Sequence, residues 1–410
     1  MDLLSIEDCQ KIAKKCYPTK NVQVLSYEMR LTTDAEAGFI SSTNLLYITV
    51  NVDGQIAELN FFLKTLPENQ YHRKNVEISR VFYKEVEFFR SIWPNVCKYF
   101  AYKTTPICYH ADPEKLLVLE NLSRKNYKNV NARELFDVPH CQAVLKILAS
   151  FHAASFLYEK EKNSTIAEMY PDLGCDRINW FKDEKGHPGY EHCQVGVRAI
   201  GAVLDRHFNS VPVEIRNKVK NLLSSNPSFL LPSKVHRNAL SHSDLWCNNL
   251  MFHYDDEGKI DDCVLVDFQL FGYCPPATDV YSMIFIVTDK QFRAKHSAEL
   301  AEFYYSHFAE CLRKNGADPD ELLSWGEFQN SVPEVIRVAL TNTPIFLHYV
   351  LLPEKELADV FSDVELTKKF MEVDRSEIVL RAVEENRTYR DRLFASLNDC
   401  IDYFNGNLVI

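Results

Sequence analysis

The first third of the chain contains short hydrophobic runs that predict strands. Two of them, Leu45 to Val50 and Ile56 to Lys64, are rich in β-branched and aromatic residues, and Asn51-Val52-Asp53-Gly54 lies between them. An Asp-Gly pair between two such runs favours a hairpin, because glycine accepts positive φ without strain. A third run, Leu116 to Leu119, predicts another strand and continues directly into Glu120-Asn121-Leu122. We therefore expect a small antiparallel sheet in this part of the chain.

Between the second and third runs, apolar positions recur with helical spacing. The segment from Val81 to Phe89 predicts a helix with one buried face, and Glu85 lies within its apolar stripe. Two interpretations of Glu85 stay open: a solvated glutamate at the edge of the stripe, or a glutamate turned inward toward Lys64. The role of Lys64 is equally open, because a lysine at the end of an apolar strand often packs its aliphatic stem and leaves its ammonium group in water.

The later part of the chain is expected to be mainly helical. Pro139 to Lys160 predicts a long helix, since proline suits the first helical turn. One face of this helix carries Val144, Leu148, Phe151 and Ser155. Two further apolar stretches, Tyr281 to Val287 and Pro344 to Leu352, predict buried helix. No internal repeat or linker separates these elements.

The candidate catalytic and metal-binding residues lie between positions 240 and 280. Two apolar runs flank a turn-rich centre at Gly258, which predicts a second hairpin. If the turn centres on Gly258, Asn249 and Asp267 face one another across its strands. An amide oxygen beside a carboxylate suits Mg²⁺, which leaves its other coordination positions to water and phosphate. Asp244 precedes Asn249 by five residues, where the hydroxyl of a phosphoryl acceptor needs a base or an orienting group.

Composition narrows the class of protein. The chain has 410 residues, of which 46% are hydrophobic, and a formal net charge of −11. This is ordinary globular composition, and an acidic chain is a poor match for nucleic acid. The twelve cysteines contain no Cys-x-x-Cys pair, so structural zinc is not expected. The sequence shows neither a secretory signal nor a transmembrane run, so we expect a cytoplasmic protein without a transmembrane segment.

Taken one at a time, these polar residues have simple structural explanations, because Asp and Asn are common turn formers. Taken together and in order, they form a specific pattern. A strand lysine is followed by a helix glutamate, by His-x-Asp with Asn five residues after the Asp, and by an apolar strand that ends in Asp-Phe. Protein kinases use this pattern for phosphoryl transfer.

At these positions the sequence resembles the ecdysteroid-kinase-like family of insects, which is related to choline kinases and aminoglycoside phosphotransferases. The family's His-Gly-Asp-x-x-x-x-Asn motif stands here as His242 to Asn249, and its Asp-Phe-Gln-like motif as Asp267 to Gln269. Further matches, in chain order, are Phe62 to Lys64, Phe82 to Glu85, Leu119 to Leu122, Phe151 to Ser155 and Pro276 to Asp279. The resemblance implies an α+β, bilobal, protein-kinase-like fold. Its small antiparallel-sheet N-lobe would span residues 1–122 with a hinge at 119–122, and its larger helical C-lobe would span 123–410.

The resemblance also implies an ATP site in the N-lobe. Lys64 would hold the α- and β-phosphates of ATP and pair with Glu85. Backbone groups of Glu120 and Leu122 would bind the adenine edge. The loop that begins at Gly38 would face the phosphates, although it has one glycine where protein kinases use three.

The remaining roles fall on the second hairpin and its surroundings. By resemblance, Asp244 would orient or deprotonate the acceptor hydroxyl, and Asn249 and Asp267 would ligate Mg²⁺. Asp279 would accept backbone N–H bonds from the catalytic loop, and His242 would do similar packing work. The sequence departs from the family at Ser243, which stands where the family has glycine.

The function expected from these features is ATP-dependent phosphorylation of a hydroxyl on a small hydrophobic alcohol, such as a steroid hormone or a foreign compound. Two alternatives stay open. Ser243 and the glycine-poor loop motivate a catalytically weak or dead kinase-like protein that binds nucleotide or lipid. A choline- or aminoglycoside-type kinase would need an acidic cage for its cationic substrate, and none is recognisable. Apolar C-terminal runs such as Ile345 to Val350 either line an apolar pocket or belong to the helix core.

Overall fold

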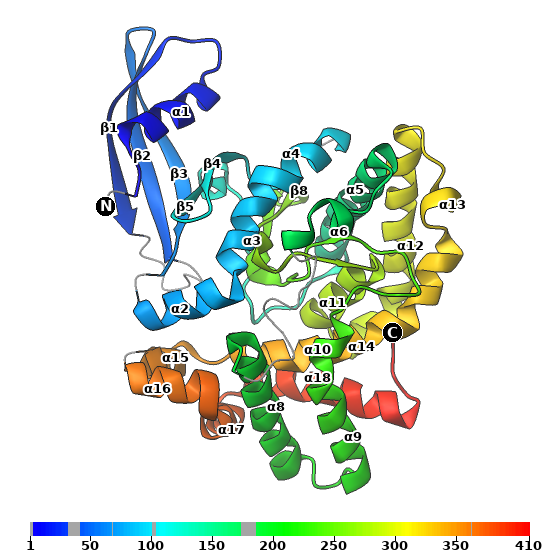
Figure 1. Ribbon diagram of the computed structural model, residues 1–410. Helices are drawn as coiled ribbons and strands as arrows, with labels where there is room; N and C mark the ends of the chain where they lie inside the picture. Colours follow the sequence, from blue (N-terminus) through cyan, green and yellow to red (C-terminus); the bar gives the residue numbers. More distant parts are fainter. Residues whose placement is uncertain (1–2, 32–41, 68, 101–103, 174–185, 362) are drawn as a thin grey trace. The chain divides into compact units, whose positions relative to one another are not determined.

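The computed structural model describes residues 3–31, 42–67, 69–100, 104–173, 186–361 and 363–410. The chain divides into two compact units, which are labelled by their elements in Figure 1. Unit 1 comprises Met1–Lys128 and Phe252–Gln269, and unit 2 comprises Asn129–Met251 and Leu270–Ile410. The sequence predicts a single boundary after residue 122. In the structure, Phe252–Gln269 also belongs to unit 1.

Unit 1 contains a five-stranded antiparallel sheet in the order β1-β2-β3-β5-β4. Its strands are β1 (Val22–Leu31), β2 (Ser42–Val52), β3 (Gln55–Thr65), β4 (Cys108–Asp112) and β5 (Leu116–Glu120). The predicted hairpin is confirmed, because Val52 pairs with Gln55 around Asp53 and Gly54, which both have positive φ. The antiparallel sheet expected in an α+β protein is therefore present, with β1 and β4 added at its edges.

Helix α1 packs against the sheet, and the other helices of unit 1 follow β3. Figure 1 shows α1 (Ile6–Cys16) beside the strands, and its Ile12 and Ala13 share a buried core with Ile48 and Leu63. The capping box of Ser5 and Asp8 fixes the start of α1. After β3 come α2 (Gln70–Ser79), α3 (Val81–Glu87), a π-helical turn (Phe88–Ile92) and α4 (Trp93–Val96). The helix predicted over Val81 to Phe89 is thus confirmed.

The second predicted hairpin is also present. Strands β7 (Leu250–Tyr254) and β8 (Ile260–Leu265) form a two-stranded sheet. Within unit 1, Phe252 and Lys128 exchange two backbone hydrogen bonds of 2.8 Å, and the Leu265 N–H donates to the Thr104 carbonyl at 2.9 Å. These bonds fix the hairpin to unit 1 through its own backbone and hold the residues that follow β8.

Unit 2 is helical apart from two short paired strands, β6 (Ala239–Ser241) and β9 (Gly272–Cys274). Its helices are α5 (Val138–Lys162), α6 (Ile166–Met169), α8 (Pro188–His207), α9 (Val213–Ser224), α10 (Asn226–Phe229), α11 (Ala277–Val287), α12 (Lys290–Lys314), α13 (Pro319–Leu322), α14 (Trp325–Val350), α15 (Glu354–Phe361), α16 (Val364–Lys368), α17 (Ser376–Glu385) and α18 (Arg387–Asn405). The α+β class with a larger helical part is therefore confirmed.

Helix α5 is the core of unit 2. It is buried on all faces between Ile147 and Tyr158 rather than on the single predicted face. By length and composition α5 passes as a membrane span, although 83% of its most apolar window is buried inside the protein; α14 and α15, bent by 74° at their junction, also pass as a pair. A helix surrounded by other helices needs apolar residues all round, which explains the composition of α5.

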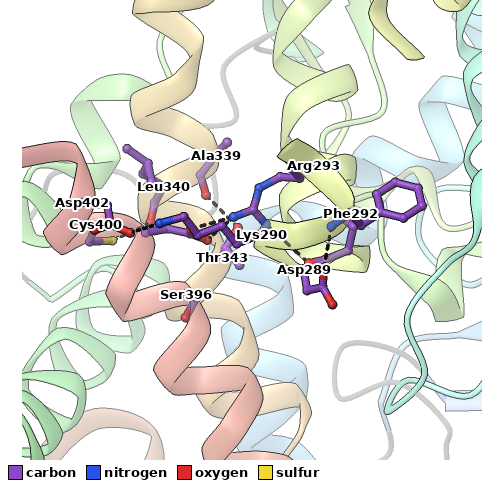
Figure 2. Close-up of polar contacts among 12 residues, drawn as sticks. Asp289, Lys290, Phe292, Arg293, Ala339, Leu340, Thr343, Ser396, Cys400 and Asp402 are labelled. Carbon is purple, nitrogen blue, oxygen red and sulfur yellow. Dashed lines mark hydrogen bonds and ion pairs between the residues drawn. The ribbon is translucent and has the colours of Figure 1, made fainter. Parts of the chain in front are cut away.

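Charged side chains join the helices of unit 2 at the start of α12. Figure 2 shows Lys290 reaching Asp402 at 2.6 Å and the Phe292 N–H capped by the Asp289 carboxylate at 2.7 Å. Arg293 donates from one nitrogen to both carboxylate oxygens of Asp399, at 2.6 Å each, and both side chains are buried. Burial of an ion pair is costly unless the geometry is good, so these contacts fix the approach of α12 to α18 rather than simply adding stability.

Candidate active site

Lys64, near the end of β3, is the centre of a buried ion cluster in unit 1. Its Nζ lies 2.9 and 2.8 Å from the two carboxylate oxygens of Glu85 on α3 and 2.8 Å from Oδ1 of Asp267. The side chains of Lys64 and Glu85 are 8% and 1% exposed, whereas that of Asp267 is 24% exposed. The structure therefore places Glu85 inward, and Lys64 does not reach into solvent as a strand-closing lysine often does.

The electrostatics of this cluster follow from burial and from its charges. Burial would lower the pKa of Lys64, but the fields of Asp267 and Glu85 outweigh it and raise the pKa above its ordinary value. Burial raises the pKa of the Glu85 carboxyl, and Lys64 opposes that rise. Lys64 is thus firmly protonated and shared between two carboxylates, one of which is partly open to solvent.

The Asp-Phe pair after β8 is held by α3 and the following turn. The Phe268 N–H donates to Oε1 of Glu85 at 3.2 Å, and the Phe268 ring stacks on Phe88 with centroids 4.1 Å apart. Asp267 has φ of +67°, which aspartate adopts more readily than most residues. Glu85 therefore holds both the lysine and the backbone that follows Asp267.

The predicted hinge residues lie at the end of β5. The Glu120 N–H donates to the Ile107 carbonyl at 2.8 Å, so an adenine contact at Glu120 would use its carbonyl. The Glu120 side chain accepts from Lys125 at 2.5 Å, and Leu122 begins a short 3₁₀ turn. Gly38, predicted to face the phosphates, lies outside the described residues.

The predicted catalytic loop belongs to unit 2. It follows β6 and ends in a 3₁₀ turn, Cys247–Asn249. Asn249 donates from Nδ2 to the Asp244 carbonyl at 2.8 Å and to the Asp244 carboxylate at 2.9 Å. The spacing of five residues thus closes a small ring, which leaves the Asp244 carboxylate half-buried and oriented by its own loop.

Asp279, in the first turn of α11, binds the backbone just before Asp244. Its two carboxylate oxygens accept the His242 N–H at 2.7 Å and the Ser243 N–H at 2.9 Å. Burial would raise the pKa of Asp279, but hydrogen bonds from His152 and the loop hold it below the usual range. His242 is fully buried, and its Nδ1 accepts the Asp244 N–H at 3.3 Å.

Ser243 stands in this braced turn with φ of +70°. Glycine reaches this conformation without penalty, whereas a residue with a Cβ is strained there. The departure from the family's glycine therefore falls on a position whose backbone is left-handed. The Ser243 N–H donates to Asp279, and the Asp244 N–H donates to Nδ1 of His242; these two bonds keep the turn in place.

Sequence reasoning missed the groups on α5 that support the loop. Ser155 accepts the Leu240 N–H on β6 at 2.9 Å, and His152 Nε2 lies 3.2 Å from Asp279. His152 also contacts the Tyr304 hydroxyl at 2.7 Å through Nδ1. The Phe151 to Ser155 motif contains both residues, but the sequence alone does not indicate which groups they contact.

Apolar side chains border the catalytic loop within unit 2. The Trp246 ring meets Phe346 of α14 edge-on, with centroids 5.1 Å apart. The same two residues line a small hollow together with Cys247, Ile286 and Val350. Part of the run predicted either to line a pocket or to belong to the core, Ile345 to Val350, therefore borders this hollow.

The predicted residues thus form two groups. Lys64, Glu85 and Asp267 meet in unit 1, while Asp244, Asn249 and Asp279 meet in unit 2 with His242. The pairing of Asn249 with Asp267 across the hairpin stays a prediction. Within the ranges that the structure describes, no group of three or more His, Cys, Asp or Glu side chains is arranged to hold a metal ion.

Several solved structures of phosphotransferases are similar at low identity. An aminoglycoside 2'-phosphotransferase-IIIa mutant with GDP has a TM-score of 0.42 and 11% identity, over 98% of this chain and 100% of that one. The streptomycin–ATP complex of APH(2")-IIa has a TM-score of 0.38 and 13% identity, over 92% and 100%. A choline/ethanolamine kinase family protein from Mesorhizobium loti has a TM-score of 0.35 and 12% identity, over 96% and 99%. All three TM-scores lie below 0.5.

The family comparison is more specific. No curated protein matches the chain. The model of the ecdysteroid kinase-like family matches residues 38–317, which is more than half of the chain. That range contains Lys64 and Glu85 in unit 1 and the braced loop with Asp244 and Asn249 in unit 2. The chain therefore belongs to the ecdysteroid kinase-like family.

Proposed function

We propose that the protein is an ATP-dependent kinase that phosphorylates a hydroxyl group of a small hydrophobic alcohol. The observation that carries the proposal is the buried Lys64, shared between Glu85 on a helix and Asp267 after a hairpin. A buried lysine between two carboxylates is expensive to assemble for stability alone. Protein kinases use the same lysine–glutamate pair to align the phosphates of ATP. Membership of the ecdysteroid kinase-like family supports this assignment.

The side chains divide the work as follows. Lys64 binds the α- and β-phosphates and gives up part of its contact with Asp267 to do so. The Glu120 carbonyl and the Leu122 N–H face the adenine edge. Asp244 accepts the proton of the acceptor hydroxyl while the oxygen attacks the γ-phosphorus, and ADP leaves with the displaced electron pair. Phosphoryl transfer is mainly positioning and charge stabilisation, which suits this set of residues.

The donor set fits a magnesium ion. Asn249 donates both of its hydrogen bonds to Asp244 from Nδ2, and its amide oxygen is the atom that would bind the metal. Asp267 accepts from Lys64 through Oδ1 and is partly exposed. These two oxygen donors are of the kind Mg²⁺ prefers when phosphate and water complete its shell. When bound, the ion neutralises charge on the β- and γ-phosphates.

The proposed acceptor is an apolar alcohol, and steroids are the favoured class. Membership of the ecdysteroid kinase-like family favours this class, and the aromatic pair Trp246 and Phe346 borders the catalytic loop. We place the reaction in the cytoplasm, which agrees with the absence of disulfides among the eleven cysteines that the structure describes. A cationic substrate would require an acidic cage, whereas the hollow beside Trp246 and Phe346 is lined by one acidic and one basic residue, Glu134 and Arg392.

The test separates Asp267 from Asp244. Asp267→Asn should lose the thermal stabilisation that millimolar ATP gives in the presence of Mg²⁺, because a ligand of the metal is weakened. Asp244→Asn should keep that stabilisation, while phosphate transfer to hydroxylated steroids falls by about 10² to 10⁴-fold. Asp256→Asn, in the exposed hairpin turn, is the matched control and should behave as wild type.

The outcomes are distinct. If wild type shows no Mg²⁺-dependent shift with ATP, the kinase proposal fails. A shift without transfer to any alcohol would favour the alternative of a catalytically dead nucleotide-binding protein. Equal thermal behaviour of the two active-site variants would mean that their division of roles is wrong.

A further inference from the structure

A second buried polar layer lies behind Asp279 in unit 2. His152 on α5 and Tyr304 on α12 are both fully buried. His152 Nε2 lies 3.2 Å from Oδ2 of Asp279, and Nδ1 lies 2.7 Å from the Tyr304 hydroxyl. Three helices, α5, α11 and α12, thus each contribute one member to a single chain of hydrogen bonds.

The direction of these bonds follows from the chemistry of the groups. An ionised carboxylate only accepts hydrogen bonds, so the hydrogen must reside on Nε2 of His152. Burial, reinforced by the charge of Asp279, raises the pKa of Tyr304, so its hydroxyl keeps its proton. In the Nε2–H tautomer Nδ1 carries a lone pair, and the Tyr304 O–H donates to it. The chain therefore runs from Tyr304 through His152 to Asp279.

We propose that Tyr304 is a positioning residue for the phosphoryl transfer proposed above, on which this inference rests. Its hydroxyl donates to Nδ1 of His152 and holds the imidazole ring in place, and His152 then gives Asp279 a third N–H donor. Asp279 in turn holds the N–H groups of His242 and Ser243, which place Asp244. Tyr304 touches neither nucleotide nor acceptor in this scheme, and it acts through the backbone of the catalytic loop.

The Tyr304 hydroxyl has a specific effect because Tyr304, His152 and Asp279 are all buried. Without that hydroxyl, Nδ1 of His152 loses its donor and the imidazole ring is held through Nε2 only. The ring then turns away from Asp279 more often, and its N–H bond to the carboxylate is weakened. Asp279 then holds its charge with two backbone donors only, so the turn at Ser243, already strained at φ of +70°, opens more often.

The hydroxyl can be removed without disturbing the packing. The Tyr304 ring stacks against Phe328 with centroids 5.3 Å apart, and phenylalanine preserves this contact. Tyr389→Phe is a matched control, because the Tyr389 side chain is also buried in unit 2 and its hydroxyl donates to the His348 carbonyl at 2.6 Å. Both substitutions delete one buried hydroxyl bond, and only one of them touches the chain to Asp279.

The first measurement is amide hydrogen exchange of the segment around His242 and Ser243, which needs no substrate. Tyr304→Phe should speed exchange of these amides by about tenfold, and Tyr389→Phe should leave them unchanged. In a His152→Gln background, Tyr304→Phe should add nothing, because the path to Asp279 is already interrupted. Equal exchange in Tyr304→Phe and wild type, or an undiminished effect in the His152→Gln background, would overturn the proposal.

The second measurement is turnover. Tyr304→Phe should lower kcat by roughly tenfold with the KM for ATP within about twofold of wild type, since only the placement of Asp244 changes. A rise in KM with kcat unchanged would contradict a positioning role. If wild type transfers no phosphate at all, the proposed function falls, while the exchange experiment still decides whether Tyr304 controls the loop.

Discussion

The two units each enclose a buried carboxylate, but they satisfy it in opposite ways. Glu85 in unit 1 is held mainly by the cation of Lys64, which it shares with Asp267. Asp279 in unit 2 accepts two backbone N–H groups and the imidazole of His152. Accordingly, burial raises the pKa of Glu85, whereas the donors around Asp279 overcome burial and lower its pKa.

The difference indicates which group is built to change partners. A lysine between two carboxylates can exchange one of them for a phosphate with little change in its total charge environment. Asp279, by contrast, has both oxygens occupied by groups that belong to the fold. The cluster of unit 1 is thus suited to bind a ligand, whereas the hydrogen bonds of Asp279 in unit 2 form a fixed support.

The largest effect is expected for Asp279→Ala. Removing the carboxylate leaves two backbone N–H groups and His152 without their acceptor in a buried position, which should cost roughly 4 kcal/mol of unfolding free energy. Asp137→Ala, which removes an exposed helix cap from α5, should cost only about 1 kcal/mol. Urea denaturation of both variants gives the comparison. A loss for Asp279→Ala no larger than that of the cap variant would show that Asp279 is not a brace.

A smaller effect is expected from the coupling in unit 1. Lys64→Met and Glu85→Ala each leave a buried group without its partner, so each alone should be destabilising. The double variant should be less destabilised than the sum of the two by about 2 kcal/mol, because the partners act through one contact. The loss of turnover in the double variant should likewise be smaller than the two single losses combined. Strict additivity would contradict the direct contact that makes this cluster a unit.

The pH dependence of the Lys64→Met variant sharpens the contrast further. Without the ammonium group the Phe268 N–H alone opposes the effect of burial on Glu85, so the pKa of this carboxyl rises further in the folded state. The folded variant then binds more protons than the unfolded chain, so its stability falls as pH rises through that pKa and recovers as pH falls. Relative to wild type, Lys64→Met should gain on the order of 2 kcal/mol between pH 8 and pH 5.

Two controls accompany that measurement. The double variant Lys64→Met/Glu85→Gln has no carboxyl to protonate, so its stability relative to wild type should vary far less over this range. Asp279→Ala should not show the gain either, because a depressed pKa contributes stability that is lost only at acidic pH, as pH falls through it. A flat profile for Lys64→Met would mean that Glu85 is not held ionised by the lysine.

Sequence patterns predicted the parts of this contrast that depend on local order. The Asp53-Gly54 hairpin, the helix over α3 and the strand that carries Lys64 follow from hydrophobic spacing and turn chemistry. The edge strands β1 and β4 were not predicted, although β1 alternates apolar with polar residues. β4 is a short run of five half-buried residues of mixed polarity, which has no strong strand pattern of its own.

The contacts that join distant segments were harder to predict. The inward direction of Glu85 was one of two open interpretations, because helical spacing cannot tell which neighbour a stripe faces. The link from Tyr304 to His152 spans 152 positions of sequence, and neither residue carries a motif that names its partner. The resemblance to a family supplied Asp279 as a support, and the structure supplied the layer behind it.

The smallest effect is expected at Ser243, where the two units can be compared once more. Ser243, just before Asp244, has φ of +70°, and Asp267 has φ of +67°. Asp267 has a role that requires its carboxylate, whereas Ser243 contributes an N–H that glycine retains. Ser243→Gly should therefore stabilise the protein by about 1 kcal/mol through relief of backbone strain and change turnover by less than tenfold. Ser243→Ala keeps the strain and should give no gain, which distinguishes the backbone from the hydroxyl. A several-hundredfold rise in turnover for Ser243→Gly would instead show that the natural loop holds a weakened kinase, because the serine would then be displacing Asp244 from its working position.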